Sequence, residues 1–323
     1  MKKITSIFLV FAILSLSLMS FSASSQITVF VDGDKLDFKD AEPFIEGGRT
    51  LVPFRAIAEA LGAEVGWDAS TKTVTIIKGD SKDTTAVTDD VYASNAPDGS
   101  KNIKIIIGEK NAEVNGNKVQ LDVPAKIATG RTYVPLRFVS EAMEMGVNWD
   151  AKTKKITIDT PEVYITLDKN NAEVGDIVKA TVNIKNFYGF AGFQVNLKYD
   201  PEVIQPIDTA SNAAFTDTSL PDEGTLLKGK FSPTAMANND VANGTLTYGS
   251  AYINMEAYKK SGKSESTGSV AVFNFKVLKK QQTTLNFQNS SAMTNAKNGT
   301  MLFNWDGTSL TNYKVKGAAE LNK

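Results

Sequence analysis

Residues 189–208 read GFAGFQVNLKYDPEVIQPID, and this stretch decides how the second half of the chain folds. Apolar and polar residues alternate in it, a period of two that predicts a strand with one buried and one solvated face. The buried positions are Phe193, Val195, Leu197 and Tyr199. The following Asp200-Pro201 pair ends the strand, because proline lacks the N–H that a ladder needs and restricts the residue before it. The pattern therefore predicts one strand of a β-sandwich followed by a turn.

Strand patterns recur throughout residues 162–319, with turn residues between them and no long helical period. About nine short strands in about 155 residues are typical of a jelly-roll or related sandwich. The expected strands are Val163–Leu167, Ile177–Ile184, Phe190–Tyr199, Thr225–Lys228, Thr245–Ile253, Val270–Leu278, Thr284–Phe287, Met301–Trp305 and Tyr313–Val315. A helical turn is expected at Met255–Tyr258. This half is predicted to be an all-β domain.

The first half contains an internal repeat. Residues 48–76 read GRTLVPFRAIAEALGAEVGWDASTKTVTI and residues 130–158 read GRTYVPLRFVSEAMEMGVNWDAKTKKITI, at an offset of 82 and with 16 of 29 positions identical. Such similarity without a gap indicates a duplicated structural unit. Asp-Gly and Asn-Gly pairs, Asp32-Gly33 and Asn115-Gly116, add a hairpin turn before each unit.

Each unit predicts one short helix packed on a small antiparallel sheet. Pro53 and Pro135 suit the first helical position, and an apolar stripe at i, i+3, i+4 and i+7 follows them. Gly62 suits the position just after the first helix. A unit this small buries little apolar surface alone, so we expect the two copies to pair. The predicted fold class is mixed: an α+β duplicated region followed by an all-β jelly-roll sandwich.

The chain is expected to begin with a signal peptide at residues 1–25. A basic start precedes an apolar stretch, and small residues offer cleavage points that we place between Ser22 and Gln26. The apolar stretch is short and interrupted by serines, so no membrane span is expected after cleavage. The duplicated region then covers 26–160, as copies 26–79 and 103–160 with a polar linker at 80–102, and the sandwich covers 162–319.

Composition excludes several functions. The net charge is −1 and the hydrophobic fraction is 42%, so a core can form, whereas a basic footprint for nucleic acid is absent. The chain has no cysteine and no histidine. This excludes disulfides, thiolate nucleophiles, Ser-His-Asp triads and the usual zinc or copper sites.

The duplicated units resemble the copper amine oxidase N-terminal, or stalk, repeat of secreted bacterial proteins. GRT-x-VP-x-R, the helix and the WDA-x-TK turn carry the resemblance over roughly residues 27–160. It implies no oxidase activity, because that catalytic domain requires histidine ligands. It implies a spacer, or an element that binds the cell wall.

Two interpretations of the repeated arginines remain open. In one, Arg49, Arg55, Arg131 and Arg137 pair with carboxylates while Trp67 and Trp149 fill the core. In the other, these arginines hold an anionic or glycan wall polymer through bidentate contacts.

The second half resembles the cohesins, the modules that capture dockerins in cellulosomes, and it is most similar to type II cohesins. Five segments occur in cohesin order: residues 168–186, 189–208, 237–252, 273–280 and 299–307. Type I is the weaker match, because its recognition strand usually carries Asn and Asp where this chain has Gly192 and Gln194.

The resemblance implies a dockerin-binding face on one open sheet, built from strands three, five, six and eight. Alternation within the strands selects the outward residues. They are Gly192, Gln194, Asn196, Lys198, Thr247, Gly249, Ala251, Val272 and Asn274. Dockerins carry calcium loops, so calcium is implied on the partner, and no metal or cofactor is expected on this chain.

The expected function is that of an exported, non-catalytic adaptor, held non-covalently at the cell surface, which binds the type II dockerin of a scaffoldin. A carbohydrate-binding module is the alternative, although no row of exposed aromatic residues is visible. A glycosidase would need two carboxylates roughly 5 to 10 Å apart, a spacing that a sequence does not reveal.

Overall fold

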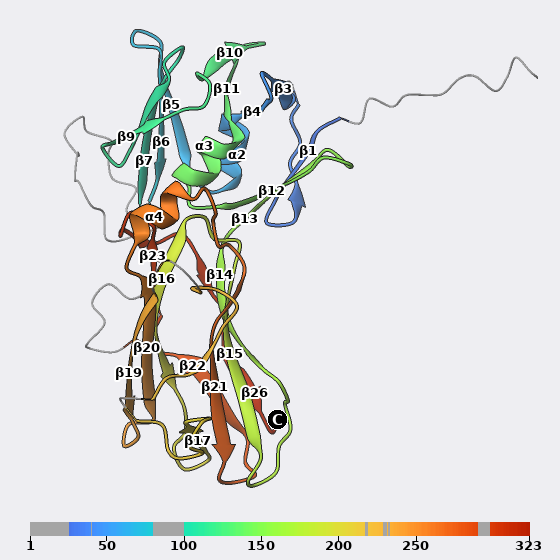
Figure 1. The fold of residues 1–323 in the computed structure, drawn as a ribbon. Helices are drawn as coiled ribbons and strands as arrows, with labels where there is room; N and C mark the ends of the chain where they lie inside the picture. Colours follow the sequence, from blue (N-terminus) through green and yellow to red (C-terminus); the bar gives the residue numbers. More distant parts are fainter. Residues whose placement is uncertain are drawn as a thin grey trace, which may run out of the picture.

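The computed structural model describes residues 26–39, 41–79, 100–216, 219–228, 231, 233–289 and 298–323. The N-terminal half forms small sheets with two short helices, and the C-terminal half forms a long two-sheet sandwich (Figure 1). This confirms the predicted fold class. The expected signal peptide, and residues 80–99 of the expected linker, lie outside the described residues. Residues 101–102 of that linker instead begin strand β7 (Lys101–Ile106).

Three sheets make up the N-terminal half. One runs in the order β12 (Gly146–Asp150), β13 (Lys155–Asp159), β1 (Thr28–Val31) and β2 (Asp34–Lys35). A second runs β10 (Lys126–Ala128), β11 (Arg131–Pro135), β4 (Arg49–Pro53) and β3 (Phe44–Glu46). The third runs β5 (Glu64–Asp68), β6 (Thr73–Lys78), β7, β8 (Asn111–Val114) and β9 (Asn117–Gln120).

Every one of these sheets contains strands from both copies of the repeat. Strand β1 of the first copy pairs in parallel with β13 of the second, and β6 of the first copy pairs with β7 at the start of the second. The expectation that each copy carries its own antiparallel sheet is therefore wrong in this respect. Local sequence patterns define strands and turns but not the partner of an edge strand, so this exchange had no local signal.

The two copies meet through one symmetric strand pair. Strand β4 runs antiparallel to β11, and Val52 lies opposite Val134, its own equivalent at the offset of 82. Leu51 lies opposite Pro135, and the equivalent pair Tyr133 and Pro53 lies on the other side. A local twofold axis therefore passes between the two valines, as in the isologous interface of a symmetric dimer.

Helices α2 (Phe54–Ala60) and α3 (Leu136–Ala142) share one core with these strands. Ile57 and Val139, at equivalent positions, are fully buried, and so are Ile76 and Ile103 from the exchanged strands. Fully burying a side chain of this size contributes roughly 1.5–3 kcal/mol. The predicted pairing of the copies thus supplies the core that neither copy has alone.

The sandwich consists of two sheets. One runs β17 (Ile204–Ile207), β21 (Gly268–Val277), β15 (Ile177–Lys185), β14 (Glu162–Leu167) and β25 (Lys314–Val315), with β18 (Asp222–Glu223) also on β21. The other runs β19 (Pro233–Asp240), β20 (Thr245–Tyr252), β16 (Phe190–Lys198), β22 (Thr283–Phe287) and β26 (Ala319–Leu321). Strand β23 (Thr300–Asn304) also pairs with β16, and β24 (Ser309–Leu310) pairs with β23.

The predicted alternation of buried and solvated residues along strand β16 is confirmed. Phe193, Val195, Leu197 and Tyr199 are at most 2% exposed and pack in the core between the sheets. Phe273 and Phe275 of β21 meet them from the opposite sheet. The expected turn at Met255–Tyr258 is helix α4 (Met255–Lys260), whose first turn is capped by the side chain of Asn254.

One strand prediction was wrong, and the strands β17, β19, β24 and β26 were not predicted. Residues 225–228, expected as a strand, form a bend, and the nearby strand is the two-residue β18. Strand β19 was missed because its sequence, PTAMANND, contains mainly residues with low strand propensity. It is nevertheless held along its length by hydrogen bonds to β20.

Candidate functional site

The candidate site is the outer surface of β19, β20, β16 and β23, which we call the open face. Its residues alternate with the core residues of the same strands. Across the sheet they lie in four rows: Thr234, Ala251, Gly192 and Phe303; Met236, Gly249, Gln194 and Met301; Asn238, Thr247 and Asn196; and Asp240, Thr245, Lys198 and Asn286 of β22.

The first two rows form a flat, mainly apolar floor. Met236 is 79% exposed, and Met301 and Phe303 are half-buried. Glycines lie beside them: a Cβ on Gly192 would come within 2.5 Å of the Cβ of Ala251 on the paired strand. A partner's backbone can therefore approach closely here. Exposed apolar side chains around a floor of small residues are typical of the centre of a protein interface.

The last two rows are polar, and some of their polar side chains form hydrogen bonds within the domain. Asn196 is 1% exposed. Its Oδ1 accepts a 2.7 Å hydrogen bond from Thr247, and its Nδ2 donates to the Gln288 carbonyl at 2.8 Å. Lys198 donates to the carbonyl of Asn243 in the neighbouring turn. Asn196 therefore connects strands under the face instead of presenting a free polar group, contrary to the expectation of an outward contact.

Two predicted residues lie elsewhere. Val272 and Asn274 belong to β21, which pairs with β15, β17 and β18 in the other sheet. Asn274 is 3% exposed, and its Nδ2 donates to Thr209 at 2.6 Å and to Asp222 at 3.0 Å. Assigning them to the open face was wrong, because β21 was taken for the eighth strand, in the same sheet as β16. The position that flanks β16 belongs to β22 and β23.

Sequence reasoning missed Met236, Met301 and Phe303. Applying a period of two to residues 300–304 places Leu302 inside and would have placed Met301 and Phe303 outside, so a signal existed for these two. Met236 had none, because β19 itself was not recognised. The other predicted residues, Gly192, Gln194, Lys198, Thr247, Gly249 and Ala251, do lie together on this face.

The described residues of the duplicated half leave the open face uncovered. This half stacks on one end of the sandwich, so the long axes of the two halves continue one another (Figure 1). The polar contacts between the halves involve residues 188 and 311–314, outside the open face.

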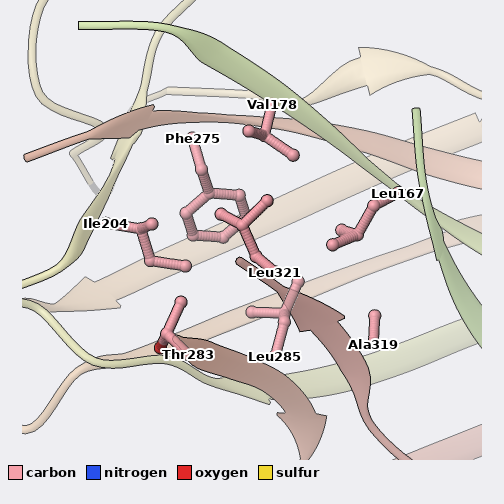
Figure 2. A pocket seen from close by; sticks show the side chains of 8 residues that line it. All are labelled: Leu167, Val178, Ile204, Phe275, Thr283, Leu285, Ala319 and Leu321. Carbon is pink, nitrogen blue, oxygen red and sulfur yellow. The ribbon is translucent and has the colours of Figure 1, made fainter. Parts of the chain in front are cut away.

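A small apolar cavity lies between the two sheets, at the end of the sandwich where β26 packs (Figure 2). It measures about 10 Å³ and is lined by Leu167, Val178, Ile204, Phe275, Thr283, Leu285, Ala319 and Leu321. One water needs about that volume and two to four polar partners, and this lining offers a single hydroxyl. The cavity is a packing gap with no room for a substrate.

The repeated arginines are mostly engaged with carboxylates. Arg49 Nε lies 2.7 Å from Asp122 Oδ2, and Arg137 Nη1 lies 3.4 Å from the same oxygen. Arg55 lies 3.5 Å from Glu59 and also donates to the carbonyl of Val65. Arg131 begins β11 and is exposed. Arg49, Arg55 and Arg137 thus pair with acidic side chains, and all of these pairs are partly open to solvent.

The repeated WDA-x-TK segments are turns. Asp68 accepts hydrogen bonds from Ser70 and Thr71, and Asp150 accepts them from Lys152 and Thr153. These bonds hold the pKa of the Asp68 carboxyl at about 2. Trp149 packs against the core as expected, whereas Trp67 is 42% exposed. Among the described residues, no three acidic side chains gather as a candidate metal site.

The site is therefore an exposed sheet face beside a filled core, a geometry that suits docking of another macromolecule and offers no substrate cavity in the sandwich core. Comparison with known proteins identifies the family. Residues 163–308 match the cohesin domain, and residues 30–158 match the copper amine oxidase N-terminal domain. The chain therefore belongs to the cohesin family, with a copper amine oxidase N-terminal domain before the cohesin.

Two solved structures and one curated protein are similar to this chain. The second type II cohesin module of the cellulosomal adaptor ScaA scaffoldin of Acetivibrio cellulolyticus is 40% identical, with a TM-score of 0.50 over 51% of this chain and 97% of that one. A cohesin from a type II Cohesin-X-Dockerin complex of the same organism is 40% identical, with a TM-score of 0.49 over 50% of this chain and 98% of that one.

A third relative is Cell surface glycoprotein 1 of Acetivibrio thermocellus, 43% identical over 157 residues. That match covers 48% of this chain, which spans only 7% of the length of the glycoprotein. Within the described part of this chain, no helix has the length and apolar character needed to cross a bilayer.

Proposed function

We propose that this protein is an exported, non-catalytic adaptor of the cellulosome. Its cohesin domain receives a type II dockerin, such as that of a scaffoldin, on the open face. Its copper amine oxidase-like repeats hold that receptor at the cell surface or at a distance from it. The observation that carries the proposal is the uncovered floor of Gly192, Gly249 and Ala251 beside the exposed Met236.

The size and chemistry of the open face support protein docking. A standard recognition surface buries roughly 800 Å² per partner, which requires a broad flat face and no pocket. Affinity in such interfaces comes from a few central apolar contacts. Met236, Met301 and Phe303 are placed to provide them, while Asp240 and Asn238 lie at the polar rim.

The test is binding to purified dockerins of both types. The full-length chain is titrated with a type II and a type I dockerin by native gel shift and calorimetry, with calcium and then with chelator. We expect tight binding to the type II dockerin and loss of binding with chelator, because the calcium loops belong to the dockerin and the dockerin needs the metal to fold. Binding only to type I dockerins would overturn the assigned class.

A matched pair of variants locates the binding surface. Met236→Asp places a charge at the centre of the open face and is expected to weaken type II dockerin binding about tenfold or more. Val174→Asp is the control, because it makes the same kind of change at an exposed residue in a loop that is not part of the open face. Equal effects of the two variants would argue against this face. Capture by cellulose instead of dockerin would favour a carbohydrate-binding module.

The role of the repeats as wall-binding elements is a separate part of the proposal. Arg49 and Arg137 converge on Asp122 and remain 46% and 66% exposed, so they can exchange that carboxylate for an anionic polymer. Co-sedimentation of the full-length chain with purified cell walls tests it. Loss of sedimentation in Arg49→Gln/Arg137→Gln would support wall binding through these arginines, unchanged sedimentation of this variant would exclude them as the binding site, and a parent chain that does not sediment would leave the repeats as a spacer.

A further inference from the structure

The junction between the two halves is built from the end of helix α3. The chain that follows this helix contacts residues 311–312, at the tip of the sandwich nearest the repeats (Figure 1). Tyr188 and Lys314 make further contacts between the two halves, at separate points. On the repeat side of the junction, Glu141 and Glu144 belong to the second copy, and Asp32 and Lys78 belong to the first.

Glu144 is the centre of the junction. Its Oε2 accepts hydrogen bonds from the backbone N–H groups of Thr311 at 2.9 Å and Asn312 at 3.0 Å, and from the Thr311 hydroxyl at 3.3 Å. Its Oε1 forms an ion pair with Lys101. The side chains of Glu144 and Lys101 are 14% and 8% exposed. A buried carboxylate with this many charge-assisted bonds holds its partners firmly, and losing them would leave Lys101 as an unpaired buried charge.

Asn312 completes the contact from the sandwich. Its Nδ2 donates to the carbonyl of Met143 at 2.6 Å, and its Oδ1 accepts from Lys78 at 3.1 Å. The last carbonyls of a helix lack partners within the helix. A residue of the cohesin domain thus satisfies the C-terminal end of α3, so the two domains share their hydrogen bonds at this point.

The two copies of the repeat differ at the residues that make this junction. At the offset of 82, Glu144 corresponds to Gly62, and Gly146 corresponds to Glu64. Both Gly62 and Glu144 have positive φ, +77° and +54°. Glycine adopts that conformation without strain, whereas glutamate does not. The second copy therefore carries a strained residue where the first copy has glycine, and the carboxylate of that residue binds the cohesin domain.

At position 146 the difference is reversed, because the second copy has glycine where the first copy has Glu64. A Cβ at this position would come within 2.5 Å of both the Cβ and the carbonyl oxygen of Asn186 in the sandwich. Only glycine lets the backbones of β12 and residue 186 approach this closely. Glu64, the equivalent residue in the first copy, is exposed. Two positions in a span of three residues have thus diverged, each in the direction that the junction requires.

Other contacts flank this centre. Tyr188 donates a 2.7 Å hydrogen bond to Glu141 on α3. Lys314 lies 3.0 Å from Asp32, which also accepts bonds from the backbone N–H and the hydroxyl of Thr160 at 2.6 and 2.7 Å. Three separated points of contact resist both bending and rotation about the connecting chain.

We propose that the repeats and the cohesin domain form one rigid body, locked by Glu144 and Gly146, so that the open face keeps a fixed orientation relative to the stalk. This inference concerns the free chain and holds whether or not the partner is a dockerin. It goes beyond a spacer role, because a flexible spacer would let the receptor reorient, whereas a locked one determines the direction in which it points.

The test measures distances between the two domains. The chain has no cysteine, so Lys35→Cys and Lys259→Cys, at exposed sites in the two halves, allow two spin labels to be attached specifically. In the otherwise unchanged chain we expect a single narrow distance between the labels. Glu144→Gly restores the residue of the first copy and removes the bonds to residues 311–312, and we expect the narrow distance to be lost.

Glu64→Gly is the matched control, because it makes the same replacement at an exposed position of the first copy. It is expected to leave the distance narrow. Gly146→Glu is a second disrupting variant, and circular dichroism checks that each variant is folded. A broad distance in the unchanged chain would overturn the proposal, and so would a narrow distance in folded Glu144→Gly. If Gly146→Glu fails to fold, Glu144→Gly alone decides.

Discussion

Thr247 donates a hydrogen bond to Asn196 beneath the open face, over 2.7 Å and between neighbouring strands. Asn196 also satisfies the carbonyl of Gln288, and both bonds are shielded from water. We predict that Asn196→Leu costs about 1–3 kcal/mol of unfolding free energy, because it leaves Thr247 and Gln288 without these bonds. Urea unfolding measures the loss, and Gln194→Leu on the same strand, half-buried, is the comparison. Equal stability of Asn196→Leu and the parent would show that the buried network contributes little.

Gly192 is packed too closely to accept a side chain. Its Cβ would lie 2.5 Å from that of Ala251, whereas a Cβ on Gly66 of edge strand β5 would find its nearest neighbour at 3.8 Å. We predict that Gly192→Val destabilises the chain by about 1–3 kcal/mol through overpacking. Gly66→Ala should change stability far less. Thermal unfolding compares the two, and a Gly192→Val protein as stable as the parent would contradict the close approach of β16 and β20.

Asp32 makes the junction sensitive to acid. Partial burial raises its pKa, but hydrogen bonds from Thr160 and the charge of Lys314 outweigh this and hold the pKa below its ordinary value of 3.8. A carboxyl with a lowered folded pKa stabilises the protein above its unfolded pKa and loses that contribution as the pH falls. We predict that Asp32→Asn is less stable than the parent at neutral pH, by about 1 kcal/mol or less given its exposure.

The same difference should vanish well below pH 3.8, where both proteins carry a neutral side chain at position 32. Urea unfolding at the two pH values provides the measurement. Asp34→Asn, in the same turn and exposed, is the control. A difference between Asp32→Asn and the parent that persists in acid would mean that the charge of Asp32 is not what stabilises the junction.

The segment between β6 and β7 can be shortened. Lys78 and Lys101 lie opposite each other at the ends of these antiparallel strands, so a short turn can join them. We predict that replacing residues 80–99 with a four-residue Gly/Asn turn leaves the fold and stability within about 0.5 kcal/mol of the parent. Circular dichroism and thermal unfolding check this. A large loss of stability would show that the replaced segment packs against the domain.

Sequence reasoning succeeded where the pattern is local. The alternation around Phe193 identified the central strand and its buried side, and the stripe at Ile57 identified a helix in each repeat. It failed where the answer depends on strands distant in sequence. Asn274 follows the same alternation as Asn196, and only the pairing of β21 with β15 places it in the other sheet. The sequence therefore missed the apolar members of the open face and indicated an exposed Asn196, and the binding of a dockerin to this face stays a prediction.

The strand pairing between the two copies of the repeat also differs from the expectation, and the reason is physical. Apolar periodicity specifies that β1 and β6 need partners, but any compatible edge satisfies that need. The junction was likewise not predicted, although the sequence alignment of the two copies contains a signal for it. Glu144 opposite Gly62 is a substitution that backbone conformation disfavours, and such a departure marks a position held by something outside the repeat.

The symmetric pairing of Val52 with Val134 has a consequence for the ancestry of this chain. Each copy completes the other's sheets, so a polypeptide with one copy would expose unmatched edges and half a core. Such a polypeptide would be expected to self-associate as a twofold homodimer through the same strand. Fusing two such subunits by gene duplication would yield the arrangement seen here and would leave the second subunit free to acquire Glu144 and Gly146, which contact the cohesin domain.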